Sequence, residues 1–501
     1  MGSGPCHQTA AAPSGTTSAR PQIAETHTGM VFLVGDRAYK VKKPVVTDFL
    51  DFSTLERREQ ACARELILNS RLAPNSYLGV AHFTPPGGAP EPVIVMRRHP
   101  DERRLATLVR RGEPVEDELA TVALVLARFH ASASRGREVD AAGRVEAIAA
   151  RWQENIAELE RYADGVVPGL DAQAVAEIGR LATDFIGGRS VLFARRIAER
   201  KVVDGHADLL ADDIFCLDDG PALLDCLEFD DHLRYVDVVD DAAFLAMDLE
   251  FLGRPDLAAT FLRTYLRLAE DDAPPALGDL YVAYRAVVRA KVDCVRHTQG
   301  NPGAAADAQR HLRIALNHLR AGAVRLILIG GGPGTGKTTL ARSLAERLGA
   351  QVISTDDVRA ELVGRGQIAG TPGVLDEGLY TRENIDTVYD DVLRRAHLGM
   401  CEGRTVILDG TWHDARHRER ARRLAADSGA VLFEFACTAS IDATVDRIRT
   451  RTNTTSQVTA EIATALADRT EDSWPGAHRI DTTVALADSV AQAQEICCLA
   501  I

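Results

Sequence analysis

The sequence predicts two folds in one chain: an α+β fold in the N-terminal half and a three-layer α/β fold with a parallel sheet in the C-terminal half. In the first half, short β-rich runs come early and long helical patterns follow. From residue 324 onward, apolar strand-like runs alternate with helical patterns, which is typical of a parallel sheet covered by helices on both faces. The glycine-rich stretch GGPGTGKTT at 331–339 follows the first of these runs and precedes a helical pattern.

Length and composition indicate a globular protein with more than one domain. The 501 residues suffice for two or three domains, and 46% of them are apolar, without a run long enough to span a bilayer. The formal charge of -14 argues against a broad nucleic-acid-binding surface. The nine cysteines are scattered without a C-x-x-C pair, which fits a reducing cytoplasm. From these three observations we expect a cytoplasmic protein with no membrane or nucleic-acid partner. Residues 1–22 lack a signal-peptide pattern and are expected to form a disordered tail.

The first half begins with a predicted hairpin. Residues 30–34 and 38–42 are β-rich runs separated by Gly35-Asp36-Arg37, and in the second run Lys40 and Lys42 share one face of the strand. Apolar spacing and breaker residues then predict a helix at 53–72, a strand at 92–96, a helix at 118–132, a helical region at 141–200, and helices at 240–252, 258–268, 280–297 and 304–319. His130 falls in an apolar helix, so we expect it to be a buried, hydrogen-bonded core residue and not a base.

An acidic hairpin is predicted within the first half. The runs 214–217 and 222–225 flank an Asp-Asp-Gly-Pro turn, and counting outward from it pairs Ile214 with Asp225. Asp213 and Asp225 should therefore arrive at the same end of the hairpin. Two carboxylates that close repel each other unless a cation lies between them, and magnesium takes oxygen ligands. We expect a magnesium site at this end.

The glycine-rich stretch of the second half fits the phosphate-loop pattern G-x-x-x-x-G-K-[ST]. Its glycines allow successive N–H groups to point at phosphate oxygens, and the following helix adds the positive end of its dipole. The Lys337 amine can reach the transferred phosphoryl group, and the Thr338 hydroxyl can ligate Mg²⁺. The predicted nucleotide-binding residues here are Gly331, Gly332, Gly334, Thr335, Gly336, Lys337, Thr338 and Thr339.

The second half alternates strands and helices. Predicted strands lie at 324–329, 351–354, 405–408 and 431–437, with a helix at 340–348 after the phosphate loop. A break at Gly322 precedes the first of these strands. We therefore expect one domain at 23–322 and a second at 323–501.

The first half resembles the aminoglycoside phosphotransferase and choline kinase group, whose fold is similar to that of protein kinases. The resemblance is carried by Tyr39-Lys40-Val41, Glu65, His206-Ala207-Asp208, Asp213 and Leu224-Asp225-Cys226. It implies that Lys40, paired with Glu65, positions nucleotide phosphates and that Asp208 orients the acceptor hydroxyl and takes its proton. Asp213 and Asp225 would hold the metal. His206 is expected to brace the catalytic loop.

Three positions depart from the pattern of that family. Ala207 stands where Gly is usual, Leu210 where His is frequent, and Asp213 where Asn is usual. An additional carboxylate beside phosphate can change the metal preference or weaken nucleotide binding. The alternative to an enzyme is therefore a non-catalytic ligand-sensing pseudokinase that regulates the second half.

The second half resembles small P-loop kinases of the gluconate kinase, adenylate kinase and polynucleotide kinase type, over residues 324–501. Asp356 and Arg359 follow the second strand, and the resemblance implies that Asp356 activates the acceptor hydroxyl while Arg359 holds substrate; Asp357 is the rival for the first role. The same residues also fit the first turn of a helix, where Asp is favoured.

Three further residues of the second half receive roles from the same resemblance. Asp409, at a strand end, would hold magnesium through water, as a Walker B-like carboxylate does. Arg447 and Arg451 would neutralise charge during transfer as lid arginines, although a solvated helix face is an equal alternative.

Together these resemblances imply an ATP-dependent or GTP-dependent kinase, assisted by Mg²⁺, that phosphorylates hydroxyl groups of small molecules and has two nucleotide sites. The second half is the leading catalyst. A mechanical or signalling ATPase ranks last, because nothing in the second half resembles the sensor and arginine-finger apparatus of such machines. Fold families this broad host many acceptors, so the acceptor stays open.

Overall fold

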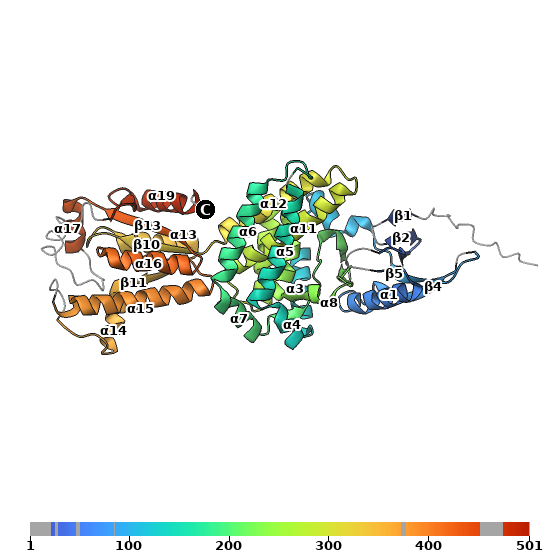
Figure 1. Cartoon of the computed structure of the whole chain (residues 1–501), viewed down its shortest axis with the longest axis horizontal. Coiled ribbons are helices and arrows are strands. Elements are labelled where there is room, and N and C mark those ends of the chain that lie inside the picture. Colours follow the sequence, from blue (N-terminus) through green and yellow to red (C-terminus); the bar gives the residue numbers. More distant parts are fainter. Residues whose placement is uncertain are drawn as a thin grey trace, which may run out of the picture. The chain divides into compact units, whose positions relative to one another are not determined.

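The computed structural model of the chain describes residues 22–25, 29–46, 51–84, 86–163, 165–371, 377–450 and 474–499. The chain divides into two compact units. The first contains the residues up to Glu113 together with Asp212–Asp231, and the second contains Pro114–Ala211 and the residues from His232 onward (Figure 1). Across the described ranges, none of the helices combines the length and the apolar character needed to cross a membrane.

The first unit is built around a five-stranded antiparallel sheet in the order β1-β2-β3-β5-β4. Its strands are β1 (Gln22–Glu25), β2 (Gly29–Val34), β3 (Arg37–Lys42), β4 (Tyr77–Phe83) and β5 (Glu91–Arg97). The predicted hairpin is β2 and β3, and its turn residue Gly35 has a φ of +58°, a conformation that suits glycine. The sequence missed β4 because half of its residues are exposed, including Leu78 and Phe83, and it lacks a clean alternation.

Helix α1 (Leu55–Asn69) covers one face of this sheet. It starts at Thr54, whose side chain accepts a hydrogen bond from the Arg57 N–H, as expected of an N-cap. Its wholly buried Cys62 belongs to the apolar core that also contains Ile94 of β5. The short elements η1 (Asp101–Arg103) and α2 (Leu105–Arg110) follow β5.

The acidic hairpin of the first unit has a register different from the predicted one. It consists of β7 (Ile214–Leu217) and β8 (Gly220–Leu223), and Ile214 pairs with Leu223. The predicted pairing of Ile214 with Asp225 is wrong by two residues. The turn contains only two residues, because Gly220, at a φ of +117°, already belongs to the second strand. Asp225 consequently lies beyond the end of β8.

The second unit begins with a helical region. Its helices are α3 (Glu116–Ser132), α4 (Arg137–Ala142), α5 (Val145–Ala163), α6 (Ala172–Gly187), α7 (Ser190–Ala198), α9 (Val238–Phe251), α10 (Pro255–Leu268), α11 (Pro275–Thr298) and α12 (Ala304–Ala321). The predicted helices of the first half are confirmed, with ends that differ by a few residues. Between α7 and α9, the short strands β6 (Val202–Asp204) and β9 (Tyr235–Asp237) pair antiparallel. The short elements η2 (Ala211–Asp213) and α8 (Asp231–Arg234) contain points in the sequence where the chain passes from one unit to the other.

The C-terminal part of the second unit contains a five-stranded parallel sheet in the order β11-β12-β10-β13-β14. Its strands are β10 (Arg325–Gly330), β11 (Gln351–Ser354), β12 (Val406–Asp409), β13 (Val431–Thr438) and β14 (His478–Asp481). Four of them were predicted. The sequence missed β14, where only Ile480 is buried.

Helices cover both faces of this parallel sheet. They are α13 (Lys337–Leu348), α14 (Thr355–Gly364), α15 (Arg382–Cys401), α16 (Ala415–Asp427), α17 (Ile441–Thr450) and α19 (Leu486–Leu499), with a short turn η3 (Gly378–Tyr380) before α15. Helices α13 and α19 lie on one side, and α15 and α16 on the other (Figure 1). The predicted fold class is confirmed in both halves.

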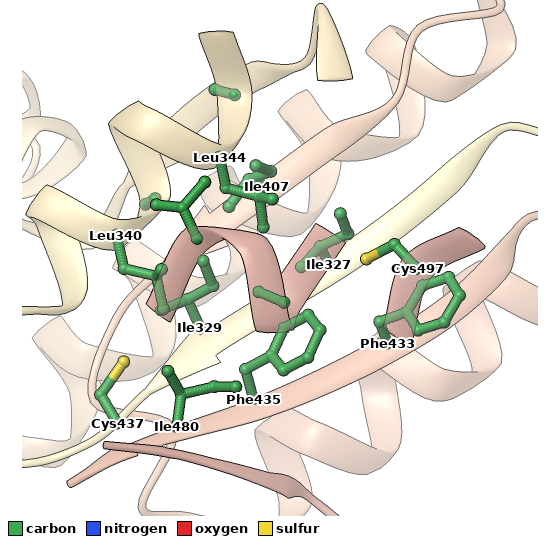
Figure 2. Packing of buried hydrophobic residues seen from close by; sticks show 14 residues of the cluster. Ile327, Ile329, Leu340, Leu344, Ile407, Phe433, Phe435, Cys437, Ile480 and Cys497 are labelled. Atoms are coloured by element: carbon green, nitrogen blue, oxygen red, sulfur yellow. The ribbon is translucent and has the colours of Figure 1, made fainter. Parts of the chain in front are cut away.

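An apolar core joins the sheet to α13 and α19. Ile327 and Ile329 lie two positions apart on β10, so their side chains share one face of the sheet. There they contact Leu340 and Leu344 of α13, with Phe435 beside them (Figure 2). All five side chains are buried. This packing holds the first turn of α13 against the end of β10, and so positions the loop between them.

Candidate functional site

The loop between β10 and α13 has the backbone that the phosphate-loop pattern requires. Gly331, Gly334 and Gly336 have φ values of +139°, +79° and +83°. A Cβ on Gly331 would lie 2.6 Å from the carbonyl oxygen of Cys437, which is too close for any side chain. Gly336 is the residue directly before α13, so the unpaired N–H groups of the first turn of α13 face the loop. The loop is a ready anion-binding site.

Two predicted ligands of the magnesium nucleotide meet at this loop. Thr338 Oγ1 donates a hydrogen bond to Asp409 Oδ2 at 2.7 Å, so the hydroxyl and the carboxylate lie side by side. Lys337 Nζ donates to the carbonyl oxygen of Gly332 at 2.8 Å. Burial raises the pKa of the Asp409 carboxyl, and the charge of Lys337 opposes that shift only in part. Thr339 follows on the exposed surface of α13.

Asp356 and Arg359 lie in contact in the first turn of α14. Arg359 Nη1 donates to Asp356 Oδ1 at 2.6 Å, and the guanidinium lies 4.7 Å from the ring centroid of Tyr380. The helix is capped by Ser354, whose side chain accepts from the Asp356 N–H. Asp356 is therefore not needed as the cap, and its carboxylate instead pairs with Arg359.

Arg447 contacts the phosphate loop from α17. Its guanidinium donates to Thr482 Oγ1 at 3.1 Å and to the Thr482 carbonyl at 2.5 Å. Thr482 Oγ1 in turn donates to the carbonyl of Thr335 at 2.7 Å, and Thr335 Oγ1 donates to the carbonyl of Gly332. Arg447 thus ties the segment after β14 to the loop. Its predicted companion Arg451 lies outside the described residues.

A chain of alternating charges lies in the first unit. Lys40 Nζ is 2.8 Å from Glu65 Oε1 and 2.6 Å from Asp225 Oδ1. Lys42 Nζ is 2.6 Å from Glu65 Oε2 and 2.6 Å from Glu228 Oε1. The angles at Glu65 depart from hydrogen-bond geometry, so its two contacts are ion pairs. The wholly buried Glu65 is therefore shared by two ammonium groups, each of which holds a further carboxylate.

The charge of Lys40 is strongly favoured in this setting. Burial lowers the pKa of its amine, but Asp225 and Glu65 outweigh burial and raise the pKa well above the usual value. The pKa of Lys42 is also raised: burial lowers it and the neighbouring Lys40 lowers it further, but Glu65 and Glu228 together outweigh both. Both lysines are thus held as cations, which is the form that binds phosphate.

The segment after β8 is fastened to α1 and to β4. The Asp225 N–H donates to the Tyr77 hydroxyl at 3.3 Å, and the Cys226 N–H donates to Asn69 Oδ1 at 2.8 Å. Asn69 Nδ2 donates to the carbonyl of Glu65 at 3.0 Å. Asp225 itself has a φ of +62°, so these bonds hold a backbone conformation that an aspartate rarely adopts.

The loop that carries Asp208 is held by Asp241 of α9. The buried Asp241 carboxylate accepts the N–H of His206 and of Ala207, each at 2.7 Å, and His130 Nε2 at 2.9 Å. Burial would raise the pKa of Asp241, but these partners outweigh it and hold the pKa below the usual range. His130 is buried and hydrogen-bonded, as predicted, and the Asp208 N–H lies 3.3 Å from His206 Nδ1.

Sequence reasoning missed several residues of these sites. Lys42 was noted only for its face of the strand, and Glu228 and Asp241 received no role. A signal for Asp241 was present, because a pair of acids interrupts an apolar helical pattern. No local pattern marks Glu228, whose lysine partner lies far away in the sequence.

The phosphate-loop site fits a magnesium ion. Among the residues that the structure describes, no three His, Cys, Asp or Glu side chains are grouped to hold a metal by themselves. A magnesium ion bound with a nucleotide needs only one or two protein ligands, since phosphate oxygens and waters complete its octahedron. Thr338 Oγ1 and Asp409 Oδ2 provide such a pair of adjacent oxygens.

These folds define a class: a kinase-like N-terminal half joined to a nucleotide-binding P-loop kinase domain. The AAA domain family matches residues 326–472. Similar solved structures include a choline/ethanolamine kinase family protein from Mesorhizobium loti, 16% identical over 61% of this chain and 94% of that chain, with a TM-score of 0.38. The APS kinase CysC of Mycobacterium tuberculosis, in complex with AMPPNP and APS, is 16% identical over 35% of this chain and 97% of that chain, with a TM-score of 0.25.

The chain also has relatives along its whole length. The proteins Rv2004c of Mycobacterium tuberculosis and Mb2027c of Mycobacterium bovis are each 57% identical to it over 490 residues, which cover 96% of this chain and 98% of each relative. The chain belongs to the family of these mycobacterial proteins.

The charge chain of the first unit predicts that Lys42→Met is strongly destabilising. The change leaves the Glu228 carboxylate without its ammonium partner and halves the compensation of the buried Glu65, which should cost about 3 kcal/mol. Hydrogen exchange of peptides from β3 and α1 in the full chain measures this opening free energy. Arg37→Met, on the same strand but with a side chain 40% exposed, is the control and should change it by less than about 0.5 kcal/mol. Equal effects of the two variants would contradict the account.

The conformation of Ala207 predicts that Ala207→Gly is stabilising. Ala207 has a φ of 68°, where a Cβ costs about 1–2 kcal/mol and the added chain entropy of glycine costs less. Scanning calorimetry should show a gain of about 0.5–1 kcal/mol. Ala269→Gly, at a φ of -83°, is the control and should lose stability. A loss in both variants would show that Ala207 is not strained.

Proposed function

We propose that the chain is an ATP-dependent phosphotransferase that transfers the γ-phosphoryl group to a hydroxyl group of a small molecule, and that residues 323–501 catalyse the transfer. The observation that carries the proposal is the meeting of the phosphate loop with Asp409. Lys337 and Thr338 belong to the loop, and the hydroxyl of Thr338 is 2.7 Å from the carboxylate. Strand ends of an open parallel sheet are where such ligands bind.

Asp356 and Arg359 supply the acceptor side of this proposal. The Asp356 carboxylate takes the proton of the acceptor hydroxyl, whose oxygen then attacks the γ-phosphorus in line with the departing ADP. Lys337 and Arg359 neutralise the charge of the transferring group, and Arg447 keeps the loop closed. A magnesium ion, held by Thr338 and by Asp409 through water, would add positive charge between the phosphates.

The proposal gives the N-terminal half, residues 23–322, a second nucleotide site. Lys40, oriented by Glu65, holds nucleotide phosphates, and its raised pKa supports this role because the amine stays charged. Asp213 and Asp225 hold magnesium, and Asp208 orients an acceptor hydroxyl.

A second candidate function for this half is ligand sensing without turnover. It is favoured by the ion pair between Asp225 and Lys40. In this pair the proposed metal ligand, Asp225, is bound to the proposed phosphate ligand, Lys40. Ligand binding would then have to exchange one partner for another. The sensor and the enzyme differ in whether Asp208 matters for turnover.

The proposal predicts that Lys337→Ala strongly lowers phosphoryl transfer by the C-terminal half and leaves the fold intact. A pool of small metabolites is incubated with the full chain and ATP labelled at the γ-phosphate, and labelled products are counted. Loss of the amine should lower turnover by about two to three orders of magnitude. The melting temperature should change little, since within the described ranges the hydrogen bond of Lys337 Nζ goes to a loop carbonyl.

The control is Arg342→Ala, which removes an exposed cation from the same helix and should keep full activity. Asp208→Ala tests the other half: loss of any labelled product makes that half an enzyme, and full retention makes it a sensor. Unchanged labelling in Lys337→Ala would rule out the C-terminal catalyst.

A further inference from the structure

A histidine lies at the same edge of the parallel sheet as the phosphate loop. His413 is in the loop between β12, which ends at Asp409, and α16, which begins at Ala415. In the sheet, β12 lies between β10 and β11. The loop after β12 is therefore flanked by the phosphate loop, which follows β10, and by Asp356, which follows β11. In the proposed transfer, the phosphoryl group passes between these two segments.

The backbone of this loop is rigidly held. Trp412 is wholly buried at a φ of 54°; its N–H donates to the Tyr389 hydroxyl at 3.2 Å, and its indole N–H donates to the carbonyl of Leu408 at 3.2 Å. The buried Arg418 donates from Nη1 to the carbonyl of Trp412 at 2.5 Å and to that of His413 at 2.9 Å. A backbone held by such hydrogen bonds can position a side chain precisely against a ligand.

One nitrogen of the imidazole is buried and left unsatisfied by the described residues. His413 Nε2 is buried and makes no hydrogen bond within the described ranges. The neighbouring His417 differs: its Nε2 lies 2.8 Å from Asp386 Oδ1, and its ring stacks on Tyr389 with centroids 4.1 Å apart. A buried polar nitrogen without a partner costs about 1–3 kcal/mol, so it needs an explanation. Arg359 Nε, on the acceptor side, is buried without a partner in the same way.

Charges nearby keep this imidazole neutral. Burial lowers the pKa of His413, and the cations Lys337 and Arg418 lower it further. A neutral imidazole has one N–H, which can donate to a phosphate oxygen.

We propose that His413 is a substrate-contacting residue of the C-terminal site, whose Nε2–H donates a hydrogen bond to an oxygen of the transferring phosphoryl group. This role rests on the proposed function and adds a residue to it. In the transfer, the bond from the β,γ-bridging oxygen to the γ-phosphorus breaks, and the bond from the acceptor oxygen forms. The acceptor proton goes to Asp356, and the imidazole keeps its own proton throughout.

The direct test is nuclear magnetic resonance of the full chain with nitrogen-15-labelled histidine. The probes are MgADP alone and MgADP with fluoroaluminate, which mimics the transferring group, and His413→Gln assigns the resonance. The Nε2 resonance of His413 should move with fluoroaluminate and stay in place with MgADP alone. If calorimetry shows that neither probe binds, the proposed function fails. If both bind and the resonance does not move, the role of His413 is overturned.

A second measurement separates contact with substrate from a structural role. His413→Ala should lower the rate of phosphate release from MgATP about 100-fold, with water as acceptor, and His413→Gln should recover part of it. The melting temperature of His413→Ala should fall less than that of His417→Ala, because among the described residues only the His417 ring loses a hydrogen bond. His417→Ala should lower the melting temperature, and His478→Ala, at an exposed position of β14, should change neither quantity. A lowered melting temperature in His413→Ala with an unchanged rate would overturn the proposal.

Discussion

Parallel strand pairing is the constraint on which the C-terminal site depends. Asp409 at the end of β12 pairs with Ile329 of β10 on one side and with Ser354 of β11 on the other. The three strands thus end at one level, and each passes directly into a functional segment. The contact between Thr338 and Asp409 follows from this register. A slip by one residue would point the Asp409 side chain to the other face of the sheet.

The first unit contains several charged side chains that are buried or partly buried. Lys40 and Lys42 share a face because they are two positions apart on β3, and the pleat aims both at α1. Glu65 pairs with both lysines, Asp225 pairs with Lys40, and Glu228 pairs with Lys42. Alternation of sign makes burial tolerable, since each charge has an opposite neighbour.

Local patterns allowed much of this to be predicted from the sequence. The phosphate loop, four of the five parallel strands and the contact partners Lys40 and Glu65 are marked by nearby residues or by a family resemblance. The register of the acidic hairpin was wrong, because an Asp-Asp-Gly-Pro sequence does not show whether Gly220 turns or pairs. Asp241 had a local signal, the pair of acids in an apolar helix, that was not used, whereas Glu228 and His413 owe their places to a partner distant in the chain or to a missing partner. No spacing rule detects either condition.

We propose that the chain binds nucleotide phosphates at two sites, one of which is the loop that begins at Gly331. Calorimetric titration of the full chain with the magnesium complex of a non-hydrolysable ATP analogue counts the sites directly. The account predicts two sites for each wild-type chain and the loss of one of them in Gly336→Val, where a side chain would meet Thr482 and Arg447. Identical stoichiometry and affinity in the two proteins, or no binding by either, would contradict it.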